Sequence, residues 1–141
     1  MPRIDKNREL MKSFHEIHAC IERLCQQQPA IMAVYLFGSA AQGKIHAASD
    51  LDVAVLLDPG AVPTFPLLTC ITQLEESLRC HVDLIVLNTA NDVLKYEVRR
   101  SGKLLFERSS RFRKQFEIQS RKAYEDFLYL HRRYAKAVLY R

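Results

Sequence analysis

The spacing of apolar residues divides the first half of the chain into one helix, two strands and a loop. From residue 5 to about residue 28, apolar residues recur at steps of three and four, which predicts an amphipathic helix ended by Pro29. The continuous apolar runs at 31–37 and 50–58 predict two buried strands, of which the second begins with two acids. A loop is expected over 59–66, because three prolines forbid regular pairing through it.

The same pattern continues with a helix and a third strand. A helical stripe predicts a helix from Leu67 to Leu78. The next apolar run, at 81–88, predicts a strand interrupted by one acid, Asp83. Either Thr89 or Asn91 can cap the short helix that follows, since both side chains accept hydrogen bonds from backbone N–H groups.

A brief strand and a long helix are expected to complete the chain. Gly102 is placed to end the short helix before a strand at 103–107. Ser109 or Ser110 then caps the last helix, and one side of it carries Phe112, Phe116, Ala123, Phe127, Leu130, Tyr134 and Val138. The order of these elements predicts an α/β (α+β) domain with a central sheet, flanking helices and a long C-terminal helix.

Length and composition favour one compact domain. The chain has 141 residues, of which 48% are hydrophobic, and no apolar run approaches the ~20 residues that span a bilayer. The N-terminus is charged with no apolar segment behind it, so we expect neither an anchor nor a secretory signal, and a cytoplasmic location. The four cysteines, Cys20, Cys25, Cys70 and Cys80, form no C-x-x-C pair and are expected to be reduced thiols.

Positive charge is concentrated at one end of the chain. The 21 Lys and Arg against 16 Asp and Glu give a net charge of +5. Residues 109–141 hold nine basic and three acidic residues, which leaves twelve and thirteen in residues 1–108. We therefore expect one domain with a nearly neutral core, 1–108, and a basic C-terminal helix, 109–141, that packs on this core and contacts a partner.

Three acids lie in strands that are otherwise apolar. Asp50 and Asp52 are two positions apart, so in a strand they point to the same side. If the strand of Asp83 lies beside theirs, three carboxylates converge, and burying them without a partner would cost several kcal/mol. A divalent cation that prefers oxygen ligands, such as Mg²⁺, would neutralise them.

A glycine turn follows the first strand. Gly38 and Ser39 lead from this strand toward a short helix, where free backbone N–H groups and a small hydroxyl suit phosphate oxygens. Taken singly, a Gly-Ser pair is a common turn and an Asp-x-Asp pair is often a solvated strand edge. Their fixed spacing, with a third acid in another strand, favours a site that binds metal and nucleotide.

These residues resemble the signature of the DNA polymerase beta-like nucleotidyltransferase superfamily. Its elements are Phe37-Gly38-Ser39, a ten-residue interval, and Asp50-Leu51-Asp52 preceded by Ser49. Small size makes the chain similar to the minimal nucleotidyltransferases, in particular to the MntA-type antitoxins that are paired with HEPN ribonuclease toxins. The resemblance implies a nucleotidyltransferase-type mixed sheet and covers most of the chain.

The resemblance also implies a mechanism. Gly38, Ser39 and Ser49 would bind the nucleotide, and Asp50, Asp52 and Asp83 would be the catalytic residues that ligate two Mg²⁺ ions, with Asp83 as general base. In the antitoxin branch, AMP passes from ATP to a tyrosine hydroxyl of the HEPN toxin and silences it. Many members carry an arginine where this chain has Gln42, so Lys44 or a distal basic residue would have to attract the triphosphate instead.

Other activities remain open at this point. The same core could act on a small molecule or an RNA end, or the chain could be a non-catalytic antitoxin that masks its partner. The basic helix carries interleaved tyrosines, which favour a protein interface, while its charge also suits nucleic acid. His46, near the acid pair, could contact nucleotide, although a loop position is its ordinary explanation.

Overall fold

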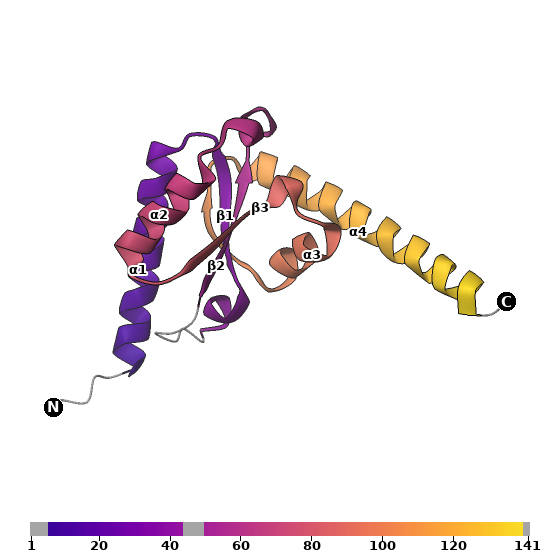
Figure 1. Cartoon of the computed structure of the whole chain (residues 1–141), viewed down its shortest axis with the longest axis horizontal. Coiled ribbons are helices and arrows are strands. Elements are labelled where there is room, and N and C mark those ends of the chain that lie inside the picture. The colour runs from indigo at the N-terminus through magenta and orange to yellow at the C-terminus, as the bar shows by residue number, and fades with distance from the viewer. Residues whose placement is uncertain (1–5, 44–49, 140–141) are drawn as a thin grey trace.

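A computed structural model describes residues 6–43 and 50–139, with side chains from residue 14 onward (Figure 1). Within these residues, four strands and four α-helices are connected in places by short 3₁₀ helices. In chain order they are α1 (Lys6–Gln27), β1 (Ile31–Phe37), η1 (Gly38–Gln42), β2 (Leu51–Leu57), η2 (Pro59–Thr64), α2 (Leu67–Leu78), β3 (Val82–Val86), η3 (Leu87–Thr89), α3 (Asp92–Ser101), β4 (Lys103–Glu107) and α4 (Ser110–Leu139).

The strands form one mixed sheet in the order β3-β2-β1-β4. β1 is antiparallel to both β2 and β4, whereas β2 and β3 are parallel. The last residues of β1 therefore lie at the same end of the sheet as the first residues of β2, β3 and β4. We call this the strand-start end, and it is where the candidate site lies.

Helices cover both faces of the sheet (Figure 1). α1 and α2 pack on one face, over a core that includes Ile21, Val53 and Leu74. α3 and α4 pack on the other face, where Leu56 and Val98 are buried. The alternation of side chains along each strand supplies both cores, since successive residues point to opposite faces.

Most predicted elements agree with the structure to within one or two residues. β1, α2 and β4 have the predicted bounds, and β2 begins at Leu51, one residue after the predicted start. The loop expected over 59–66 contains the 3₁₀ helix η2, whose first turn is stabilised by a hydrogen bond from the Gly60 amide to Asp58 Oδ1. Prolines that forbid strand pairing are compatible with so short a helix, because proline fixes φ near helical values.

Serine and asparagine side chains define where the last two helices begin. Asn91 caps α3 by accepting a hydrogen bond from the Leu94 amide. Ser109 Oγ accepts one from the Phe112 amide at the start of α4. The alternative caps lie elsewhere. Thr89 belongs to η3, before α3 begins, and Ser110 is the first residue within α4.

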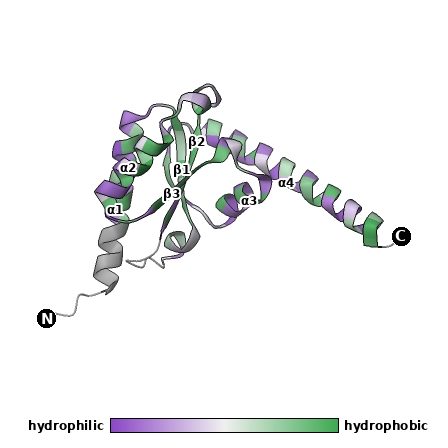
Figure 2. Ribbon diagram, viewed as in Figure 1, coloured by the Kyte–Doolittle hydropathy of each residue, from purple (hydrophilic) through white to green (hydrophobic). Residues whose placement is uncertain are grey.

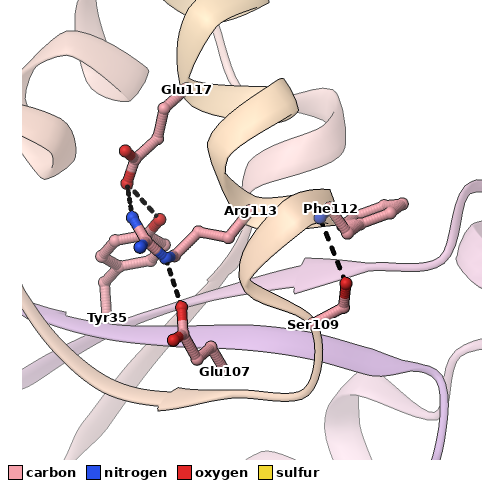
Figure 3. A network of polar contacts seen from close by, with 6 residues as sticks. All are labelled: Tyr35, Glu107, Ser109, Phe112, Arg113 and Glu117. Carbon is pink, nitrogen blue, oxygen red and sulfur yellow. Dashed lines mark hydrogen bonds and ion pairs between the residues drawn. The ribbon is translucent and has the colours of Figure 1, made fainter.

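A polar network fixes the first turns of α4 to the sheet (Figure 3). The buried Tyr35 hydroxyl donates to Glu117 Oε1 at 2.8 Å. Arg113 donates to the same carboxylate and to Glu107 of β4. One arginine thus joins two carboxylates from different elements, while Phe112 and Phe116 pack on the core beside them.

The second half of α4 extends away from the sheet (Figure 1). Apolar positions nonetheless recur along it to its C-terminal end (Figure 2). Leu130 and Tyr134 are 63% and 70% exposed, so the apolar side predicted for this helix is packed only in its first half.

The cysteines are free thiols, and three of them, Cys20, Cys25 and Cys70, are buried. Burial raises the pKa of Cys25 to about 12, which keeps this thiol protonated and unreactive at neutral pH. Within the described residues, no helix is both long and apolar enough to cross a membrane.

Candidate functional site

Strand register brings two of the three predicted acids, Asp52 and Asp83, together. Asp52 is the register partner of Phe37 in β1 and of Asp83 in β3. Asp52 and Asp83 share their side of the sheet with Ala54 and Ile85, which face the core beneath α3 and α4. Asp50 directly precedes β2 and is exposed. The condition set by the sequence, that the strand of Asp83 lies beside that of Asp52, is therefore fulfilled.

Gly38 lies directly against the Asp52 carboxylate. Its φ of +70° falls in the left-handed region that side chains other than glycine rarely adopt. A Cβ atom at this position would overlap with Oδ2 of Asp52. Glycine is therefore needed twice here, for the turn and for the close approach of the carboxylate.

The turn after Gly38 forms a short 3₁₀ helix. η1 spans Gly38–Gln42 and ends at Gly43, which is also in the left-handed region. Ser39 lies in its first turn and is half-buried. Because the first backbone N–H groups of a helix lack partners within it, the Gly38-Ser39 turn offers donors close to the Asp52 carboxylate.

Negative charge accumulates around Asp52. Its pKa lies above the usual range, first because the side chain is partly buried, then because Asp83 and Asp50 repel its charged form. A cation between these groups would relieve this repulsion. The charges at the strand-start end thus favour binding of a positive ion.

The carboxylates fit a cation that is only partly coordinated by protein. Among the described residues, no three His, Cys, Asp or Glu side chains are close enough to hold a metal ion by themselves. Mg²⁺ typically takes one or two carboxylates and completes its shell with water and substrate phosphates. Asp52 and Asp83 on adjacent strands, with Asp50 nearby, are therefore a donor set of the kind that Mg²⁺ prefers.

Some predicted residues lie beyond what the structure describes. Ser49, His46 and Lys44 fall outside the described residues. Gln42, which stands where many members of the superfamily carry arginine, is exposed at the end of η1.

One cluster near this site was not predicted from the sequence. Tyr96 of α3 stacks on Tyr124 of α4 with ring centroids 4.2 Å apart, and Arg99 and Arg100 lie over the Tyr96 ring at 5.7 and 5.9 Å. The i, i+3 and i+4 spacing of Tyr96, Arg99 and Arg100 was the available signal, since it places them on one helix face.

The fold and the acid-lined turn at the strand-start end define a nucleotidyltransferase. The chain belongs to the family described as Polymerase beta, Nucleotidyltransferase, whose model matches residues 20–111.

Two individual relatives indicate which members of this family the chain resembles. The chain is similar to the protein adenylyltransferase MntA of Shewanella oneidensis, with 35% identity over 86 residues, which are 61% of this chain and 61% of that protein. It is also similar to a toxin–antitoxin crystallised with AMP-PNP, at 28% identity and a TM-score of 0.70, covering 86% of this chain and 98% of that one.

A third relative shares the fold. It is a solved structure of the tri-AMPylated Shewanella oneidensis HEPN toxin in complex with MNT antitoxin. The identity is 24% and the TM-score 0.67, over 90% of this chain and 98% of that one. At this identity the likeness concerns the architecture alone.

Proposed function

We propose that this chain is an antitoxin that transfers AMP from ATP to a tyrosine hydroxyl of a cognate HEPN toxin and thereby neutralises it. The observation that carries the proposal is the juxtaposition of Asp52 and Asp83 across two strands, beside the Gly38-Ser39 turn. The likeness to MntA, named a protein adenylyltransferase, supports AMP transfer to protein. The likeness to a toxin–antitoxin with AMP-PNP supports an adenine nucleotide as the donor.

Each residue has a role in this reaction. Gly38 and Ser39 would bind the triphosphate through backbone N–H groups and a hydroxyl, and Ser49 would also bind the nucleotide. Asp50, Asp52 and Asp83 would hold two Mg²⁺ ions, which when bound supply positive charge to the phosphates. Asp83 is exposed, so it can also accept the proton of an attacking hydroxyl.

In the proposed reaction, the bond that forms is matched by a bond that breaks. The tyrosine oxygen attacks the α-phosphorus of ATP and gives up its proton to Asp83. The new O–P bond forms as the bond between the α-phosphorus and the bridging oxygen breaks, and pyrophosphate leaves. Positioning of the two reactants at the strand-start end supplies much of the rate enhancement, as is general for transfer between bound partners.

The direct test is transfer to the product of the adjacent open reading frame. Labelled ATP, Mg²⁺ and this partner protein are incubated with the wild type or with Asp50→Asn/Asp52→Asn. We expect label on a tyrosine of the partner with the wild type and none with the double variant. Label on RNA or on a small molecule instead would assign the same core to another acceptor.

The double variant also separates catalysis from masking. If a double variant that folds normally protects cells from the toxin as well as the wild type does, the chain acts by covering its partner, and transfer is not its mechanism.

A further inference from the structure

The apolar side of α4 continues beyond the core on which it packs. Phe112 and Phe116 hold its first half against the sheet, and Ser120 is buried on the same side. At helical spacing, this side is extended by Phe127, Leu130, Tyr134 and Val138, which we call the distal stripe. The side chains of the distal stripe are 40–70% exposed. The distal stripe is thus as apolar as the packed side of α4, but it is exposed to solvent.

Among the described residues, the outer half of α4 is largely exposed. Within the part of the chain that the structure describes, Tyr124 stacks on Tyr96 of α3, whereas the next rings, Phe127 and His131, stack along α4 itself. In proteins, a helix is stabilised mainly by packing of its apolar face against another surface. Residues 125–139 are therefore a segment that gains most when another surface covers the distal stripe.

The base of this segment is connected to the candidate active site. Ser120 accepts a hydrogen bond from Arg99 of α3 at 2.8 Å. α3 ends at Ser101, immediately before β4 begins at the strand-start end. A protein seated on the distal stripe and against α3 would lie on the same side of the sheet as Asp52 and Asp83.

Charge around the distal stripe indicates what kind of surface covers it. Residues 121–139 hold five basic residues (Arg121, Lys122, Arg132, Arg133 and Lys136) and two acidic ones (Glu125 and Asp126). The net +3 favours a partner with an acidic rim. A second copy of this chain brings the same positive charge, and RNA would leave the aliphatic Leu130 and Val138 without a matching surface.

We propose that the distal stripe is the docking surface for the HEPN toxin, which presents to it an apolar groove with an acidic rim. This inference rests on the proposed function, because that function makes this partner the acceptor. Docking here seats the partner on the face of the sheet that carries the acids. The stripe is then a determinant of partner affinity and takes no part in the chemistry.

Two tyrosines of α4 provide a matched pair of variants. Tyr134 belongs to the distal stripe, whereas Tyr129 lies on the opposite side of the helix, where Arg133 covers its ring at 5.8 Å. Both are exposed, by 70% and 59%, so each can be replaced by serine with little effect on folding. Leu130→Ser is a second variant within the stripe. Circular dichroism and thermal denaturation of each free variant check the fold.

The measurements are the affinity for the purified product of the adjacent open reading frame, by calorimetry, and AMP transfer to it as a function of its concentration. We expect Tyr134→Ser and Leu130→Ser to weaken binding at least about tenfold and to raise the KM for the partner, with kcat nearly unchanged. Tyr129→Ser should bind within about twofold of the wild type.

The outcomes separate this inference from the proposed function. Unchanged affinity in both stripe variants, with transfer intact, overturns the docking surface alone. A wild type that binds the partner but transfers no AMP refutes the proposed function, and loss of binding in the stripe variants would still support the docking surface. If light scattering shows a homodimer that these variants dissociate, or if they lose RNA binding instead, the occupant is different and the inference is wrong.

Discussion

Replacing Gly38 by alanine tests the contact that organises the candidate site. Its φ of +70° costs a residue with a side chain about 1–2 kcal/mol. The new Cβ would overlap with Asp52 Oδ2, and the strand of Asp52 is held by register partners on both sides. The carboxylate must therefore leave its rotamer, at a further ~0.5–1.5 kcal/mol.

Together these costs amount to about 1.5–3.5 kcal/mol, which lowers the Tm of a domain of this size by roughly 5–12 °C. Activity should suffer more. A displacement of a reacting group by about 1 Å can cost ~10²-fold in rate, and here a metal-binding carboxylate is displaced. We therefore expect AMP transfer, measured with labelled ATP and the partner protein, to fall at least ~10²-fold.

Gly43 provides the matched control. Its φ is +76°, but a Cβ there would have no atom of the described residues within 4 Å. Gly43→Ala should thus cost about 1–2 kcal/mol of backbone strain and leave the Asp52 carboxylate in place. If the two alanine variants, compared at a temperature where both are folded, transfer AMP at equal rates, the proposed role of the close contact between Gly38 and Asp52 is refuted.

Three further variants test the electrostatics and the packing. Asp52→Asn should reduce transfer at least ~10²-fold yet raise the Tm of the metal-free protein, because it removes repulsion from Asp83 and Asp50; a lower Tm would contradict this. Tyr35→Phe removes the hydrogen bond to Glu117 and should cost about 1.5 kcal/mol in urea denaturation, whereas no change would mean that Arg113 alone suffices. The Cys25 thiol keeps its proton when folded, with a pKa of about 12, but loses it above pH 9.0 when unfolded, so stability should fall as pH rises from 9.0 to about 12. Denaturation at about pH 8 and about pH 10.5 should show a smaller decline in Cys25→Ala, and equal declines would contradict this origin.

Local patterns were sufficient to predict most of the secondary structure and to single out the acids of the candidate site. The apolar runs ended by Gly38 and opened by Asp50 predicted β1 and β2, because a strand that is buried on both faces consists of nearly continuous apolar residues. Asp83 was recognisable as an acid in a third apolar run. Its position opposite Asp52 depends on parallel pairing of β2 with β3, which no local pattern encodes.

The sequence could not show where α4 leaves the core. Phe112 and Leu130 belong to one uninterrupted apolar side, yet the first packs on the sheet and the second is exposed. Apolar periodicity reports that a helix face becomes buried, without specifying whether its own domain or another protein covers it. The stacking of Tyr96 on Tyr124 was likewise hidden, since it joins residues of two helices.

The central claim is transfer of AMP to protein, and mass spectrometry of the partner tests it most directly. The product of the adjacent open reading frame is incubated with ATP, Mg²⁺ and either the wild type or Asp50→Asn/Asp52→Asn, and its intact mass and modified residues are determined. We predict that the wild type adds one or more AMP groups to a tyrosine and that the double variant adds none. An unmodified partner, or equal modification by both proteins, would contradict the account.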